Sequence, residues 1–237
     1  MKTAAVSGRG ILEEMTSPKK KSLQYLRDGV LFLPSFLPTA DFEMVQAECR
    51  KMRGGMKPEK GSLAVGRMGR YVDRRSNTYT LFTAETIIRR MSRLVGSPMV
   101  PSAYPIELRA YRAGSGMEWH QDDPLYEDPQ CELVLCLDNN SDSRTEWIDA
   151  SGARTAEWTP PNAALLIRAG DAGPPHRVTP LKTGERMILK MVWARPGSPR
   201  LASFYEHIDS LPGLRDRHRK QANPGRDGRS GKGKRRR

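Results

Sequence analysis

Apolar residues recur first with a helical period and then, in the second half of the chain, with a strand period. Two helical stretches run over residues 39–52 and 83–95, with Thr39 and Thr83 as their expected N-caps. A short apolar strand is expected at 30–33, before the first helix. The inward positions of the two helices are Phe42, Val45, Cys49, Met52, Ile87, Ile88, Met91, Leu94 and Val95.

From residue 106 onward the apolar period shortens to two, which is typical of strands with one buried face. Two tryptophans that flank Ser151-Gly152 predict a hairpin. Further strands are expected at 106–111, 133–137, 163–167, 177–178 and 187–193, and a last short helix at 202–208. Helices followed by many short strands indicate an α+β domain, with a jelly-roll core and N-terminal supporting helices.

Charge divides the chain into a foldable part and two polar ends. The 237 residues carry a net charge of +13. Residues 212–237 hold eleven Lys/Arg and two Asp, so they contribute +9 of it, and +4 remains for the rest. We expect a disordered segment at 1–22, a domain at 23–211 and a disordered basic tail at 212–237. The tail suits nucleic acid, nuclear import or simple solubility, since charge alone does not choose between them.

The cysteines and the lack of a long apolar stretch indicate in which cellular compartment the protein is expected. Cys49, Cys131 and Cys136 are odd in number and have no Cys-x-x-Cys spacing, which argues against a disulfide framework. No stretch approaches the length needed to cross a bilayer, and the N-terminus lacks the apolar core of a secretory signal. We expect a cytoplasmic or nuclear protein without membrane contact, of unknown oligomeric state.

His120 and Asp122 form a His-x-Asp pair, which can reach one metal from one strand because residues i and i+2 share a face. His176 is expected on a later strand, and a jelly roll brings distant strands together. Two histidines and one carboxylate are the ligand set of non-heme Fe(II) sites. The remaining histidines, His207 and His218, lie in the last helix and in the tail. The competing interpretation of His176 is a hydrogen-bonded core histidine.

Arg186 opens the apolar run 187–193, ten residues past His176. If that strand runs inward, its guanidinium is buried and requires an anion, for which a bidentate carboxylate is the natural partner. An exposed arginine at a strand edge is the alternative. The sequence therefore predicts an anion site beside the metal site.

The segments around these residues resemble the Fe(II)/2-oxoglutarate dioxygenases, and among them the prolyl-4-hydroxylase-like branch. Residues 111–123 are similar to the Y-x-x-G…H-x-D stretch of that superfamily, and 176–193 to its closing H-x-V-x-P…G-x-R…W stretch. Asp28–Leu37 resembles the entry strand and helix of the branch. The similarity covers about residues 23–195, most of the foldable chain.

The resemblance implies a double-stranded β-helix and a role for each candidate residue. His120, Asp122 and His176 would bind Fe(II), and Arg186 would bind the distal carboxylate of 2-oxoglutarate, with Tyr111 donating a hydrogen bond to it. O₂ would take the remaining metal position, and ascorbate is a candidate further cofactor. The implied reaction hydroxylates a substrate C–H bond and releases succinate and CO₂.

The resemblance leaves the substrate open, although a protein or peptide is favoured. Residues 139–144 replace a Gly-Gly-Glu stretch of many members, and many peptidyl prolyl hydroxylases carry lysine where Arg186 stands. The first alternative is an AlkB-like nucleic-acid dealkylase, but its second arginine, six residues after the first, is Val192 here. The second is a non-catalytic jelly-roll binding module with an RNA-binding tail, against which the intact ligand set argues.

Overall fold

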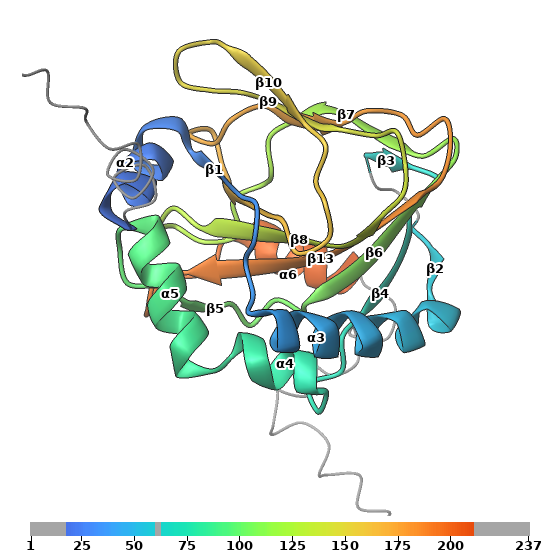
Figure 1. The fold of residues 1–237 in the computed structure, drawn as a ribbon. Coiled ribbons are helices and arrows are strands. Elements are labelled where there is room, and N and C mark those ends of the chain that lie inside the picture. The colour runs from blue at the N-terminus through green and yellow to red at the C-terminus, as the bar shows by residue number, and fades with distance from the viewer. Residues whose placement is uncertain (1–17, 60–62, 211–237) are drawn as a thin grey trace, which may run out of the picture.

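The computed structural model describes residues 18–59 and 63–210, and two antiparallel sheets form its centre (Figure 1). The larger sheet runs in the order β1 (Val30–Leu33), β11 (Ala164–Arg168), β8 (Cys131–Asn139), β13 (Glu185–Ala194), β6 (Glu107–Arg112), β4 (Met68–Tyr71), β2 (Lys57–Pro58), with β5 (Val100–Pro101) beside β13. The smaller sheet runs β10 (Arg154–Glu157), β9 (Thr145–Ile148), β12 (His176–Val178), β7 (Gly116–His120), β3 (Ala64–Val65). These facing sheets confirm the predicted jelly-roll core.

Helices cover the face of the larger sheet that points away from the smaller one (Figure 1). They are α3 (Thr39–Met52), α4 (Asn77–Phe82) and α5 (Glu85–Val95), with α2 (Pro18–Asp28) packed beside α5 and a 3₁₀ turn at Arg53–Gly55. Helix α6 (Ala202–Ser210) packs Phe204 and Ile208 in a separate cluster with Tyr104 and Tyr126. The predicted supporting helices are confirmed.

Strand β13 shows how the two-residue period divides the core from the cavity. Met187, Leu189 and Met191 belong to the large apolar cluster under the helices. Arg186 and Lys190 line the space between the two sheets instead. Because successive side chains of a strand point to opposite faces, the same ten residues build both the packed core and one wall of the cavity.

The helix starts differ from the sequence expectation. Thr39 is the first residue of α3 and not its cap, because Pro38 precedes it and no side chain caps this end. Thr83 follows α4 as its C-cap, and Ala84 is the N-cap residue of α5. The hydroxyl that caps in this region is Ser76, which accepts a hydrogen bond from the Tyr79 amide. Helix α4 has six residues, too few to show a helical period in the sequence.

Helix α2 begins inside the segment 1–22 that was expected to be disordered, so residues 18–22 are helical instead. This helix could not be predicted from the sequence, because its apolar residues form no continuous stripe. Tyr25 is buried, whereas Leu23 and Leu26 are exposed. Residues 1–17 and the basic tail 212–237 lie outside the described residues. The predictions of disorder, nuclear import and nucleic-acid binding for them stay predictions.

Two further expectations concern the cysteines and the membrane. Cys49, Cys131 and Cys136 are all buried and free, as expected of thiols outside a disulfide framework. Across the described part of the chain, every helix is too short or too polar to span a bilayer.

Candidate active site

His120 and His176 face each other on neighbouring strands of the smaller sheet. His120 ends β7 and His176 begins β12, and the two residues are directly paired in the register. Their ring centroids are 4.2 Å apart. Asp122 joins them, and one ligand atom of each residue lies within 4.8 Å of the others. The fold therefore brings the three predicted ligands together.

Asp122 lies two residues beyond the end of β7 rather than in the strand, so loop contacts hold it there. The side-chain amide of Gln121 donates to the carbonyl oxygens of Gly173 at 2.8 Å and Asp171 at 3.2 Å. A Cβ on Gly173 would lie 2.0 Å from the Arg168 oxygen, so only glycine allows this approach. These hydrogen bonds thus hold the loop that carries Asp122 against the loop that leads to His176.

Both histidines present Nε2 to the shared site. Nδ1 of His120 lies 2.8 Å from the Glu118 carbonyl oxygen, and Nδ1 of His176 lies 3.1 Å from that of Pro174. A carbonyl oxygen only accepts, so each Nδ1 carries a proton and each Nε2 is the atom turned toward the shared site. Burial lowers the pKa of His176, but Asp122 outweighs it and raises that pKa. Burial and the neighbouring His176 lower the pKa of His120, which favours the neutral imidazole that a metal needs.

Asp122 is ionised and closely surrounded. Its Oδ2 lies 3.3 Å from Nε2 of His176, and its Oδ1 accepts a hydrogen bond from Nζ of Lys190 at 3.1 Å. Lys190 also forms an ion pair with Glu132. Burial raises the pKa of Asp122, but Lys190 and His176 outweigh it and hold that pKa well below its usual range. Burial and Asp122 raise the pKa of Glu132.

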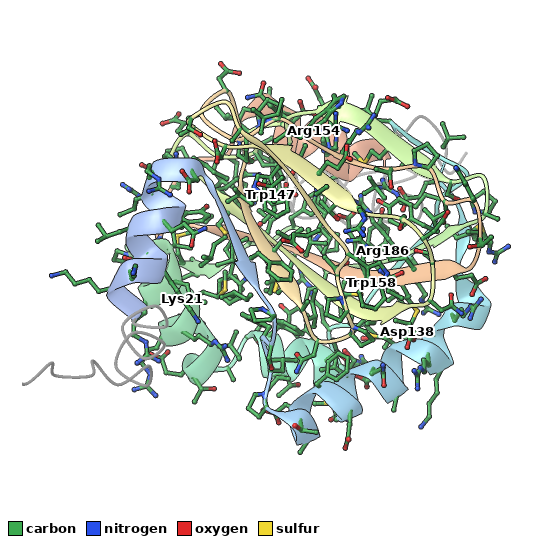
Figure 2. All side chains as sticks on the ribbon, turned by 45° about the horizontal axis from the view of Figure 1, so that its top comes forward. Lys21, Asp138, Trp147, Arg154, Trp158 and Arg186 are labelled. Atoms are coloured by element: carbon green, nitrogen blue, oxygen red, sulfur yellow. The ribbon has the colours of Figure 1, made fainter. Side chains whose placement is uncertain are left out.

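Arg186 lines the same cavity and lacks a counter-ion. It is 2% exposed, and its Nε and Nη1 have no hydrogen-bond partner. No ion pair joins it to a carboxylate in residues 18–59 or 63–210. Figure 2 shows Arg186 in the interior between the strands, whereas Lys21 and Arg154 lie at the periphery. A buried, permanently charged guanidinium without a partner is strongly unfavourable, so this position calls for an external anion.

Tyr111 lies opposite Arg186 in the β6–β13 register, as the predicted shared role requires. It is 1% exposed, and its hydroxyl oxygen accepts a hydrogen bond from Nη1 of Arg67 at 3.1 Å. A hydroxyl has one proton and two lone pairs, so Tyr111 can still donate that proton into the cavity.

Several solved structures of other proteins have a similar fold. A prolyl-4-hydroxylase from Pseudomonas putida aligns with a TM-score of 0.61 over 76% of this chain and 100% of its own, at 17% identity. The non-heme α-ketoglutarate-dependent epimerase SnoN from nogalamycin biosynthesis aligns with a TM-score of 0.66 over 86% and 91%, at 16% identity. This chain has the fold of the Fe(II)/2-oxoglutarate oxygenases. No family model and no curated protein matches its sequence.

Two solved structures of this fold contain bound molecules. SnoN has also been solved with Fe³⁺, α-ketoglutarate and nogalamycin RO. A prolyl hydroxylase from Trichoplax adhaerens, solved with a peptide fragment of a hypoxia-inducible factor, has a TM-score of 0.62 over 79% of this chain and 92% of its own, at 14% identity. The family resemblance seen in the sequence is therefore confirmed at the level of the fold.

The oxygenase-fold cavity has about 440 Å³ of empty space, part of it open to solvent. Four cationic side chains line it: Arg67, Arg109, Arg186 and Lys190. Arg67 pairs with Glu59 at 2.6 Å, and Arg109 with Glu107 at 2.7 Å. The same larger sheet also lines the cavity with apolar side chains, namely Val134, Leu165, Ile167 and Ile188. Of the four cations, only Arg186 is left without a carboxylate of the described residues.

The outer face of the smaller sheet carries a second charged cluster. The guanidinium groups of Arg154 and Arg177 lie 5.4 and 5.1 Å from the centroid of the Trp119 ring. Glu146 pairs with both arginines. These four side chains come from four adjacent strands, so they join β7 and β12, the strands of the two histidines, from outside.

The sequence motifs do not single out Lys190 or Glu132. The available signal was spacing: Lys190 is four residues past Arg186 in one strand, so both must share a face. Glu132 lies in an apolar run, where a carboxylate needs a partner.

The donor set fits Fe(II). Two imidazole nitrogens and one ionised carboxylate converge, and the unpaired Arg186 guanidinium lies in the same cavity. The site therefore offers a place for a divalent metal and a separate place for an anion.

Proposed function

We propose that this protein is an Fe(II)/2-oxoglutarate-dependent dioxygenase that hydroxylates a C–H bond of its substrate. The observation that carries the proposal is Arg186, a buried cation without a counter-ion in the same cavity as the His-Asp-His cluster. A cluster alone would suit many metal proteins. A metal site combined with an empty place for a carboxylate matches the needs of a 2-oxo diacid.

Each residue has a role that its geometry supports. His120, Asp122 and His176 hold the metal through Nε2, a carboxylate oxygen and Nε2. Arg186 binds the distal carboxylate of 2-oxoglutarate by charge-assisted hydrogen bonds, and Tyr111 donates to it. Bound Fe(II), with 2-oxoglutarate and O₂, would supply the oxidising power, turning one C–H into C–OH and releasing succinate and CO₂.

The cavity wall keeps the reaction away from bulk water. Val134, Leu165 and Ile167 form an apolar surface on β8 and β11, beside β13 in the same sheet. Exclusion of water strengthens the electrostatic interactions of the site and limits side reactions. We expect the methylene groups of 2-oxoglutarate to pack near Ile188, between Arg186 and the metal end.

A protein or peptide remains the substrate class that we favour. The support comes from the prolyl hydroxylase neighbours, one of which was solved with a peptide fragment. The epimerase neighbour belongs to nogalamycin biosynthesis, so the same fold also serves substrates other than peptides. Turnover of methylated single-stranded DNA, with none of proline-rich peptides, would instead favour the dealkylase.

The experiment for the reaction is an anaerobic addition of Fe(II) and 2-oxoglutarate, followed by O₂. We expect a weak visible charge-transfer band before O₂ and succinate after it. His120→Ala removes both signals, whereas His207→Ala, on α6, keeps both. Succinate formation by His120→Ala at the wild-type rate would refute the metal assignment.

A further inference from the structure

Lys190 is an unusual neighbour for a metal-binding carboxylate. Its ammonium lies between two acids, 3.1 Å from Oδ1 of Asp122 and in an ion pair with Glu132. The Lys190 side chain is 15% exposed and that of Glu132 only 4%. Buried charges persist when they are paired, but neutral packing would serve stability as well. The stability of the fold alone therefore does not explain the Lys190–Glu132 pair.

The intrinsic torsional preference of the Asp122 side chain does not decide which of its two carboxylate oxygens points toward the histidines. The last torsion of an aspartate is broad and two-fold, so either oxygen can turn toward the histidines. In the structure Oδ2 lies 3.3 Å from Nε2 of His176, while Oδ1 accepts from Lys190. The nearest contact of His120, also through Oδ1, is longer, at 3.9 Å. One oxygen is thus held by the lysine and the other is left toward His176.

Glu132 explains how a cation can sit so close to a metal site. An uncompensated ammonium next to Asp122 would repel a divalent ion by Coulomb interaction. Glu132 comes from β8 and Lys190 from β13, adjacent strands of the larger sheet, so their pairing is fixed by the sheet. The carboxylate offsets the charge of Lys190 and leaves its orienting hydrogen bond.

We propose that Lys190, anchored by Glu132, is a positioning residue that fixes the carboxylate of Asp122 for monodentate metal binding. The inference rests on the proposed metal site and goes beyond it, because it assigns a task to two residues outside the ligand set. Partners of ligating groups of this kind typically contribute a factor of about 10 to 100 in metal affinity.

The test uses Co(II) alone, added anaerobically to the full chain, with the visible spectrum and the dissociation constant as readouts. The double variant Lys190→Met with Glu132→Gln removes both side chains of the pair together. We expect Co(II) binding to weaken about tenfold or more and the spectrum to shift, since Asp122 is free to turn. The matched control, Arg50→Met with Asp138→Asn, removes the α3–β8 ion pair, and we expect it to change neither readout.

Single variants decide the question if the double variant does not fold. Lys190→Arg keeps a charged donor, and we expect its Co(II) affinity to stay near that of the wild type. Lys190→Gln removes the charge, and we expect weaker binding. A purely Coulombic role predicts the opposite sign, because removing a cation beside a metal would tighten binding.

The outcomes separate the two proposals. A wild-type protein that binds no Co(II) contradicts the metal site itself. A wild-type protein that binds Co(II), with a double variant of equal affinity and unchanged spectrum, overturns the positioning role alone. Equal losses in the double variant and the control pair would assign the effect to general destabilisation and also overturn it.

Discussion

Arg186 and Lys190 occupy the same face of the same strand, yet their surroundings are opposite. Lys190 contacts Asp122 and Glu132. Arg186 contacts no carboxylate of the described residues, although it is the more deeply buried of the two. A buried cation that is paired with carboxylates of the protein needs no ligand. A buried cation without such a partner is expected to bind an anionic ligand.

The two positions also differ in which part of the site they serve. Lys190 belongs to the metal end, where every charged group has a partner before any ligand arrives. Arg186 belongs to the anion end, where the fold leaves hydrogen-bond donors unused. The same inward-facing period of β13 therefore places one paired and one unpaired cation in the cavity, and we propose that the unpaired one receives the co-substrate.

Removing the unpaired cation should have the largest effect on the reaction. Arg186→Met loses two charge-assisted hydrogen bonds to the co-substrate, each contributing about 1.5–3 kcal/mol. We expect kcat/KM for 2-oxoglutarate to fall at least about a hundredfold. Arg112→Met, on the exposed end of β6, is the control and should stay near the wild-type value. An Arg186→Met enzyme with normal kcat/KM would remove the anion site from the account.

The stability of the ligand-free protein should change with opposite sign at the two positions. Lys190→Met leaves two buried carboxylates without their cation, and we expect a loss of about 3–5 kcal/mol in the free energy of unfolding. Arg186→Met instead removes an uncompensated charge, and we expect it to raise that free energy. Denaturant unfolding of both variants measures this, and destabilisation by both would erase the contrast.

Tyr111→Phe should have a smaller effect at the anion end. The substitution keeps the buried ring but removes one hydroxyl, whose hydrogen bond contributes about 1 kcal/mol. We expect the dissociation constant of 2-oxoglutarate to rise roughly fivefold, as measured with the visible charge-transfer band. An unchanged constant would limit Tyr111 to packing and to its contact with Arg67.

Trp119→Ala should have the smallest effect on ligand binding. It removes the ring that Arg154 and Arg177 contact on the outer face of the smaller sheet, at a cost of roughly 1–2 kcal/mol for two cation–π contacts. Thermal unfolding should occur earlier while 2-oxoglutarate affinity stays within about twofold. A loss of affinity as large as that of Tyr111→Phe would show that the outer cluster controls the site.

The sequence predicted the parts of the molecule that follow a strong period or a chemical pattern. The strands expected at 30–33, 106–111, 133–137, 163–167, 177–178 and 187–193 are of this kind, and so are the 39–52 and 83–95 helices and the grouping of His120, Asp122 and His176. The short strands β2, β3, β4 and β5 were not predicted. The ligands could be found because few histidines occur and because their spacing suits paired strands.

The remaining features depend on three-dimensional neighbours that no local pattern records. Helix α2 has only one buried aromatic anchor, Tyr25, and α4 is too short to show a period. Lys190 looks like an ordinary strand lysine until the register places β13 beside Glu132 of β8. The missing counter-ion of Arg186 is a property of the whole cavity and cannot be seen in the sequence.

The most direct test of the central claim compares 2-oxoglutarate with 2-oxopentanoate, which has the same chain length but no distal carboxylate. Their dissociation constants are measured anaerobically with Fe(II) in the wild-type protein and in Arg186→Met. We predict that the wild-type protein prefers 2-oxoglutarate by about a hundredfold or more and that the variant binds both within about threefold. An equally strong preference in the variant would contradict the claim that Arg186 receives the distal carboxylate.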